Sequence, residues 1–267
     1  MSSISQTKTL NNGLEMPALG LGVYQIPKGL QTEQAVLWAL EAGYRHIDTA
    51  SFYGNEADVG RAIRKSGIQR EEIFVTTKLW PTDFWRAEAA FQASLEKLGF
   101  EYLDLYLIHW PLPIGKGHAW NVLERLYKRG VVKAIGVSNY SIRDLTQLLK
   151  TADVLPTVNQ VEFSPFLYRK ELLDYCQSQH IQLEAYSPLT RGKRLYDPAI
   201  DQLAKRYQKT PAQLMISWSL QHGLVVIPKS SNQARIKENA QVFDFEISQT
   251  DMEYLDGLNE NYRALFR

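Results

Sequence analysis

The chain has 267 residues, of which 45% are hydrophobic and 22% charged, and its net charge is +1. This composition is typical of a globular protein, and a charge so close to zero gives no reason to expect nucleic acid or an acidic membrane as a partner. The single cysteine, Cys176, excludes an intramolecular disulfide and a cysteine metal cluster, so we expect a buried thiol and no metal site.

The first elements along the chain are predicted to form a β-hairpin. The turn signal Asn11-Asn12-Gly13 lies between the short stretches 8–10 and 14–16. We expect this hairpin to plug the amino-terminal end of the sheet that follows.

After the hairpin, short apolar runs alternate with amphipathic stretches, which indicates parallel βα units. The predicted strands are residues 18–22, 45–48, 74–78, 103–109, 134–138, 157–162, 182–186 and 225–228. The predicted helices are residues 32–42, 56–66, 86–98, 120–129, 142–151, 170–178, 211–221 and 236–240. Eight such units fill a closed (β/α)8 TIM barrel, and an open doubly wound sheet is the alternative. With no linker or shift in composition, we predict one domain over residues 1–267, with additional helices near the C-terminus.

Local signals mark several helix ends. Asp197-Pro198 and Thr210-Pro211 each place a capping residue before a first-turn proline. Glycines that follow helical stretches, where a left-handed residue is expected, are Gly43, Gly67, Gly99 and Gly130.

The chain does not begin with the basic start and apolar core of a signal peptide, and no uncharged apolar run is long enough to span a membrane. We therefore expect a cytoplasmic protein. No long apolar extension is evident, so we expect a monomer.

Four polar residues lie where successive predicted strands end. Asp48, Lys78 and His109 each close a strand, and Tyr53 lies in the loop after Asp48. The carboxyl ends of the strands are where a β/α barrel builds its active site. An ammonium beside a phenol favours the phenolate, a carboxylate holds the ammonium in place, and an imidazole can hydrogen-bond a substrate oxygen or relay a proton. Each residue alone could be structural, but together they suit carbonyl reduction, in which Tyr53 protonates the oxygen.

These segments resemble the signatures of the aldo-keto reductase superfamily, and in particular its bacterial diketogluconate and methylglyoxal reductases. The matching stretches are residues 43–50, 53–56, 75–80, 105–111, 135–140, 159–162, 185–189 and 226–231. The resemblance implies an NADPH-dependent reductase of small carbonyl compounds. It assigns the acid to Tyr53 and supporting roles to Lys78, Asp48 and His109.

The resemblance also implies how the cofactor binds. Ser138, Asn139 and Gln160 would hold the nicotinamide carboxamide, and Tyr186 would stack on the ring. The backbone at Gly20-Leu21-Gly22 would approach the ligand where the first strand ends. Further cofactor-binding residues that we expect are Gly22, Val23, Ser187, Leu189, Ser231, Asn232, Glu238 and Asn239.

A basic segment near the last strand is predicted to hold a phosphate. Lys229 and Arg235 flank a helix start at which Ser230, Ser231 and Asn232 offer further donors. A helix N-terminus and an arginine fork both suit an anion. The resemblance implies that this anion site holds the adenosine 2′-phosphate, and hence that NADPH is preferred over NADH; a solvated basic surface is the alternative.

The substrate pocket is predicted to be open, because the loops at 111–117 and 187–196 are short. Its wall would include Val23, Tyr24, Phe52, Trp80 and Trp110, beside His109, although Tyr24 and Trp80 could equally be rim packing. We expect broad use of small aldehydes and ketones. A non-catalytic NADPH-binding regulatory or structural barrel, and an unrelated barrel lyase or isomerase, are the competing functions.

Overall fold

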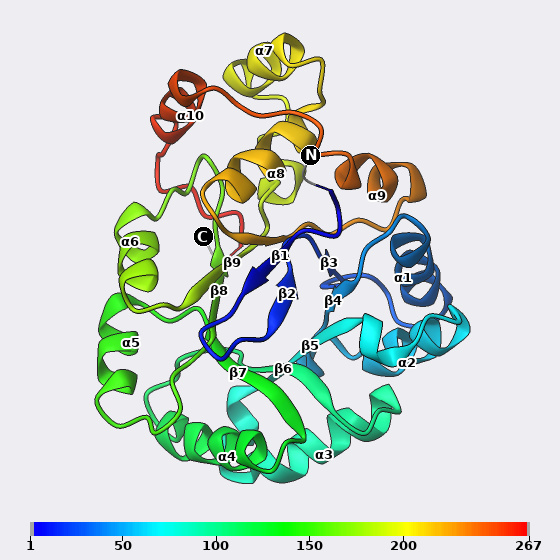
Figure 1. Ribbon diagram of the computed structural model, residues 1–267, viewed down its shortest axis with the longest axis vertical. Coiled ribbons are helices and arrows are strands. Elements are labelled where there is room, and N and C mark those ends of the chain that lie inside the picture. The colour runs from blue at the N-terminus through cyan, green and yellow to red at the C-terminus, as the bar shows by residue number, and fades with distance from the viewer. Residues whose placement is uncertain (1–2, 266–267) are drawn as a thin grey trace.

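A computed structural model describes residues 3–265, in which eight parallel strands form a barrel surrounded by helices (Figure 1). The strands are β3 (Leu21–Gly22), β4 (His46–Asp48), β5 (Phe74–Leu79), β6 (Leu103–Ile108), β7 (Val132–Ser138), β8 (Val158–Glu162), β9 (Gln182–Tyr186) and β10 (Val225–Ile227). A parallel bridge from Leu19 to Val226 and a hydrogen bond of 3.1 Å from Gly22 N to Pro228 O join the first strand to the last. The predicted (β/α)8 barrel is confirmed, and the open sheet is wrong.

Ten α-helices accompany the strands in the described residues. They are α1 (Leu30–Glu41), α2 (Glu56–Lys65), α3 (Ala87–Leu98), α4 (Lys116–Lys128), α5 (Ile142–Leu149), α6 (Lys170–Ser178), α7 (Pro198–Arg206), α8 (Pro211–Gln221), α9 (Gln233–Ala240) and α10 (Gln249–Asp256). Short 3₁₀ helices cover Ser51–Tyr53, Arg70–Glu72, Pro81–Arg86 and Thr190–Gly192. None of the helices within residues 3–265 is long and apolar enough to cross a membrane.

Two helices differ from the prediction. Helix α4 begins at Lys116, four residues before the predicted start. The prediction missed the first turn because that turn contains Gly117 and His118 and has no apolar periodicity. Helix α10 is an additional helix near the C-terminus, as expected, but its bounds were not predicted, since its buried apolar side chains are only Met252 and Leu255. Helix α7 follows the predicted cap, with Asp197 Oδ1 accepting from Ala199 N at 3.1 Å.

The predicted hairpin is confirmed at the amino-terminal end of the barrel. Strands β1 (Thr7–Thr9) and β2 (Glu15–Pro17) pair in antiparallel fashion and lie across the strands in Figure 1. Asn11 Nδ2 donates to Pro156 O at 3.0 Å, and Asn12 Nδ2 donates to Lys133 O at 2.9 Å. Buried Met16 packs with apolar residues that the barrel strands turn inward. The hairpin therefore closes this end and leaves the opposite rim for ligands.

The prediction that the backbone of Gly20-Leu21-Gly22 approaches a ligand does not apply to Gly20, although Gly22 lines the cavity described below. A Cβ added to Gly20 would lie 2.5 Å from Nδ1 of His46 and 3.0 Å from Cγ2 of Ile227. Gly20 is therefore required by the imidazole that fills the barrel interior, and not by an approaching ligand. Burial and the nearby Lys78 ammonium lower the pKa of His46 to about 3, so that this ring is neutral.

Cys176 lies on the buried face of α6 and is fully enclosed, as predicted. Burial raises the pKa of its thiol to about 11. A protonated, enclosed thiol is a poor nucleophile and serves here as a small apolar side chain.

Helix α2 packs so closely on the end of α3 that a Cβ at Gly60 would overlap the carbonyl oxygen of Leu98. We expect Gly60→Ala to lower the free energy of unfolding by about 1–3 kcal/mol, because two backbones must separate. Gly117→Ala is the matched control, since it is also helical and has open space around it. It should be neutral or stabilising by less than about 1 kcal/mol. Equal urea midpoints for the two variants would contradict the close packing.

Candidate active site

The structure brings three of the four polar residues into one hydrogen-bonded group. Lys78 Nζ donates to Asp48 Oδ1 at 2.7 Å, to the Thr49 carbonyl at 2.8 Å and to Tyr53 Oη at 3.3 Å. Asp48 comes from the end of β4 and Lys78 from the neighbouring β5, while Tyr53 lies on the short helix between them. Parallel pairing of β4 and β5 thus sets the ammonium beside the carboxylate.

Burial controls the electrostatics of this group. Lys78 is fully buried and Asp48 nearly so, and such charges are stable inside a protein only as a well-bonded pair. Burial raises the pKa of Asp48, while Lys78 and the amide of Gln160 act in the opposite direction. The ion pair between Lys78 and Asp48 therefore satisfies each partner's charge.

The phenol of Tyr53 remains protonated at neutral pH. Burial, followed by the negative charge of Asp48, raises the pKa of Tyr53 well above its ordinary value. We expected Lys78 to favour the phenolate, but in this state of the site burial and the charge of Asp48 outweigh that effect. The Asp48 carboxylate offsets the ammonium, and the phenol stays neutral.

His109 stands next to this group. Its ring makes edge-on contacts with Tyr53 at 5.6 Å and with Trp80 at 5.1 Å between ring centroids. Burial, and then Lys78, lowers the pKa of His109 well below its ordinary value, so that the imidazole is neutral. Its Nδ1 has no hydrogen-bond partner in residues 3–265. A neutral ring can donate a hydrogen bond without adding charge.

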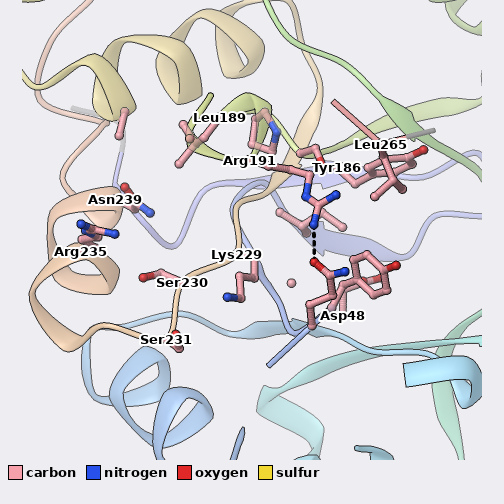
Figure 2. Close-up of a pocket in the computed structure, with 18 of the residues that line it drawn as sticks. Asp48, Tyr186, Leu189, Arg191, Lys229, Ser230, Ser231, Arg235, Asn239 and Leu265 are labelled. Carbon is pink, nitrogen blue, oxygen red and sulfur yellow. Dashed lines mark hydrogen bonds between the residues drawn. The ribbon is translucent and has the colours of Figure 1, made fainter. Parts of the chain in front are cut away.

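A cavity of about 730 Å³ opens at this rim (Figure 2). In Figure 2 it extends from Asp48 and Tyr186 past Lys229 to Arg235 and Asn239. The predicted residues that line it are Gly22, Tyr24, Asp48, Phe52, Tyr53, Trp80, His109, Trp110, Ser138, Asn139, Gln160, Tyr186, Ser187, Leu189, Lys229, Ser230, Ser231, Asn232, Arg235, Glu238 and Asn239. This size is ordinary for a small-molecule site.

Two predicted residues do not reach the cavity surface. Lys78 is fully buried, and its Nζ lies 3.3 Å from Tyr53 Oη. Val23 is fully buried and is absent from the lining among the described residues. Its expected contact with cofactor is therefore corrected: its N–H donates to Asp48 O at 3.0 Å and holds the strand end.

Amide and hydroxyl groups are tied together on the wall beside the phenol. Ser138 Oγ donates to Gln160 O at 2.9 Å, and Tyr186 Oη donates to Asn139 Oδ1 at 2.8 Å. Asn139 Nδ2 lies 3.1 Å from the His109 carbonyl, and the Asn139 backbone has a φ of 64°. These bonds fix several polar groups at the surface before any ligand arrives.

The far end of the cavity is basic. Lys229 and Arg235 line it, and no ion pair of either side chain is found in residues 3–265. Burial, and then Arg191, lowers the pKa of Lys229. The side chain of Asn232 caps α9 by accepting from Arg235 N at 3.0 Å, so it is already engaged. An anion would find two unpaired cations at this helix start.

Several lining residues were not predicted, including Gln25, Arg191, Leu195 and Leu265. Arg191 Nη2 donates to Gln25 Oε1, and both residues have a positive φ, of 56° and 58°. Leu265 belongs to a tail that buried Glu162 holds by accepting from Ala264 N at 2.6 Å. These placements depend on contacts between distant segments and have no local signal; only the basic character of the loop at Arg191 could have indicated it.

Comparisons with known proteins agree with this geometry. A model described as the aldo/keto reductase family matches residues 18–260. Glyoxal reductase of Bacillus subtilis (strain 168) is 50% identical over 265 residues, covering 98% of this chain and 96% of the relative. A crystal structure of an aldo/keto reductase from Brucella melitensis is 45% identical, with a TM-score of 0.92, covering 96% of this chain and 100% of that one. The Bombyx mori aldo-keto reductase in complex with NADP is 35% identical, with a TM-score of 0.93, covering 99% and 96%.

Matches of this extent, over almost the whole barrel and at about half identity to a curated relative, confirm the resemblance read from the motifs. The barrel topology and these relatives agree on one assignment. This chain belongs to the aldo/keto reductase family.

Proposed function

We propose that the protein reduces aldehydes and ketones to alcohols with NADPH, and that Tyr53 donates the proton. The observation that carries this proposal is the buried contact of 3.3 Å between Lys78 Nζ and Tyr53 Oη, with Asp48 behind the ammonium. A protonated phenol at the wall of a cavity, backed by a fixed positive charge, suits protonation of a developing alkoxide.

The residues present fit NADPH. Two cations that have no ion pair within residues 3–265, Lys229 and Arg235, suit the 2′-phosphate, and the amide groups of Asn139 and Gln160 suit a carboxamide. The ring of Tyr186 lies on the same wall and offers a face for stacking. Membership of the family and the relative solved with NADP support this choice. When bound, NADPH supplies the hydride.

The other residues of the site orient the carbonyl and exclude water. Neutral His109 donates a hydrogen bond to the carbonyl oxygen, which then lies within reach of Tyr53. Trp80 and Phe52, stacked at 4.0 Å, shield one side of the reacting groups. Once Tyr53 has lost its proton, the Lys78 ammonium stabilises the phenolate until solvent restores it.

The substrates that we propose are small aldehydes and ketones, dicarbonyls among them. Support comes from the relative named glyoxal reductase and from the cavity's mixed lining of aromatic rings and polar groups. The alternative, a non-catalytic NADPH-binding barrel, gives no reason for a phenol in contact with a buried ammonium. A cytoplasmic location, a monomeric state and a single domain over residues 1–267 remain predictions.

Tyr53→Phe removes the proposed proton donor and keeps the ring. We expect kcat for glyoxal reduction to fall by roughly 10²–10⁴-fold, with the dissociation constant for NADPH nearly unchanged. The control is Tyr106→Phe, because the Tyr106 hydroxyl is fully buried, is not hydrogen-bonded within residues 3–265 and lies outside the cavity. Full activity of the Tyr53 variant in an NADPH-oxidation assay would show that another group supplies the proton.

Arg235→Ala tests the phosphate end. Loss of a charge-assisted hydrogen bond should weaken NADPH binding by roughly 10–100-fold and leave NADH binding almost unaltered. Lys237→Ala, on the same helix and exposed, is the matched control and should change neither. Dissociation constants for both cofactors decide the matter; an unchanged ratio in the Arg235 variant would place the 2′-phosphate elsewhere.

A further inference from the structure

Glu184 is a fully buried carboxyl group that the proposed chemistry does not use. It lies in the middle of β9 and faces the barrel interior beneath the cavity. Its Oε2 accepts from Gln160 Nε2 at 2.8 Å. The same nitrogen also donates to Asp48 Oδ2 at 2.8 Å. Gln160 therefore stands between two carboxyl groups, one of which belongs to the Lys78 pair.

The two bonds fix the orientation of the Gln160 amide. A primary amide nitrogen has two hydrogens, and here one goes to each carboxyl group. The opposite orientation would set the amide oxygen against the Asp48 carboxylate, with which it cannot hydrogen-bond. Because Gln160 lines the cavity, the oxygen of its side-chain amide, Oε1, is the hydrogen-bonding atom left for a ligand. At this point of the cavity wall, the Gln160 side chain can accept a hydrogen bond from a ligand but cannot donate one.

Glu184 has no cationic partner of its own among the described residues. The Lys78 ammonium is paired with Asp48, and the neighbouring His46, whose Nε2 is 3.7 Å from Glu184 Oε1, is neutral. The residue paired with Glu184 on β10 is Val225, which carries no charge. Burial, and then the charge of Asp48, raises the pKa of Glu184. A protonated carboxyl keeps Oε2 as an acceptor and carries its hydrogen on Oε1, which has no partner in the described chain.

We propose that Glu184 is a positioning residue that accepts the second N–H of Gln160, so that the cavity presents a hydrogen-bond acceptor to the N–H of a cofactor carboxamide. This inference rests on the proposed use of NADP(H) and adds to it. Without Glu184, the second N–H would be unpaired and the amide free to turn toward the ligand. The cavity would then no longer distinguish a donor from an acceptor at that point.

The test compares NADP⁺ with its 3-acetylpyridine analogue, in which a methyl group replaces the carboxamide nitrogen. Dissociation constants follow from quenching of tryptophan fluorescence, since Trp80 and Trp110 line the cavity. In the wild type we expect the analogue to bind roughly tenfold more weakly, because the Gln160 oxygen loses its donor. In Glu184→Met the ratio should fall below about threefold. In Glu184→Gln, which is neutral and keeps an acceptor oxygen, it should stay near tenfold.

Two controls separate this role from a structural one. Affinity for adenosine 2′,5′-bisphosphate reports on the Lys229–Arg235 end of the cavity and should be the same in all variants. If Glu184→Met does not fold, Glu184→Leu takes its place. Glu56→Gln changes another fully buried glutamate, which bonds Thr77 outside the cavity, and should leave the ratio unaltered. An unchanged ratio in the apolar variant, or an equal fall in Glu184→Gln, overturns the inference alone. No binding of NADP⁺ to the wild type overturns the proposed function with it.

Discussion

The Lys78 ammonium lies inside the barrel without contact with water, and the rest of the site depends on how that charge is held. An isolated buried ion costs several kcal/mol, so it persists only with close, well-placed oxygens around it. Asp48, the Thr49 carbonyl and the Tyr53 hydroxyl supply them from consecutive segments of the chain. Strand pairing between β4 and β5 is thus also the device that sets the phenol against a positive charge.

The Lys78–Asp48 pair is linked by hydrogen bonds to groups inside the barrel on one side, and it lies beside groups that line the cavity on the other. Asp48 engages Gln160, and Gln160 engages Glu184, so that buried hydrogen bonds fix the polar wall. Toward the surface, Tyr53 and His109 are both neutral, because burial raises the pKa of the phenol and lowers the pKa of the imidazole. At the far end of the cavity, the positive charges of Lys229 and Arg235 favour a negatively charged group. One cavity therefore joins the proposed proton donor to the proposed anion site.

Sequence alone predicts the features that lie in short segments. The barrel follows from eight apolar runs, and Asp48, Lys78 and His109 are found because each closes one of them. Gln25 and Arg191 were missed because their contact joins segments 166 residues apart. In the sequence, Glu184 has no feature that distinguishes it from other strand residues, because its contact with Gln160 forms only in the folded barrel. The sign of the Tyr53 pKa shift depends on burial and on the balance between Asp48 and Lys78, which spacing cannot give.

The central claim is that the Lys78 ammonium enables Tyr53 to release its proton. The most direct measurement is single-turnover reduction of glyoxal by bound NADPH in H₂O and D₂O, for the wild type and Lys78→Met. The account predicts a rate roughly 10²–10⁴-fold lower in the variant, with a larger solvent isotope effect and a similar affinity for NADPH. A variant that turns over at the wild-type rate, with the wild-type isotope effect, would contradict it.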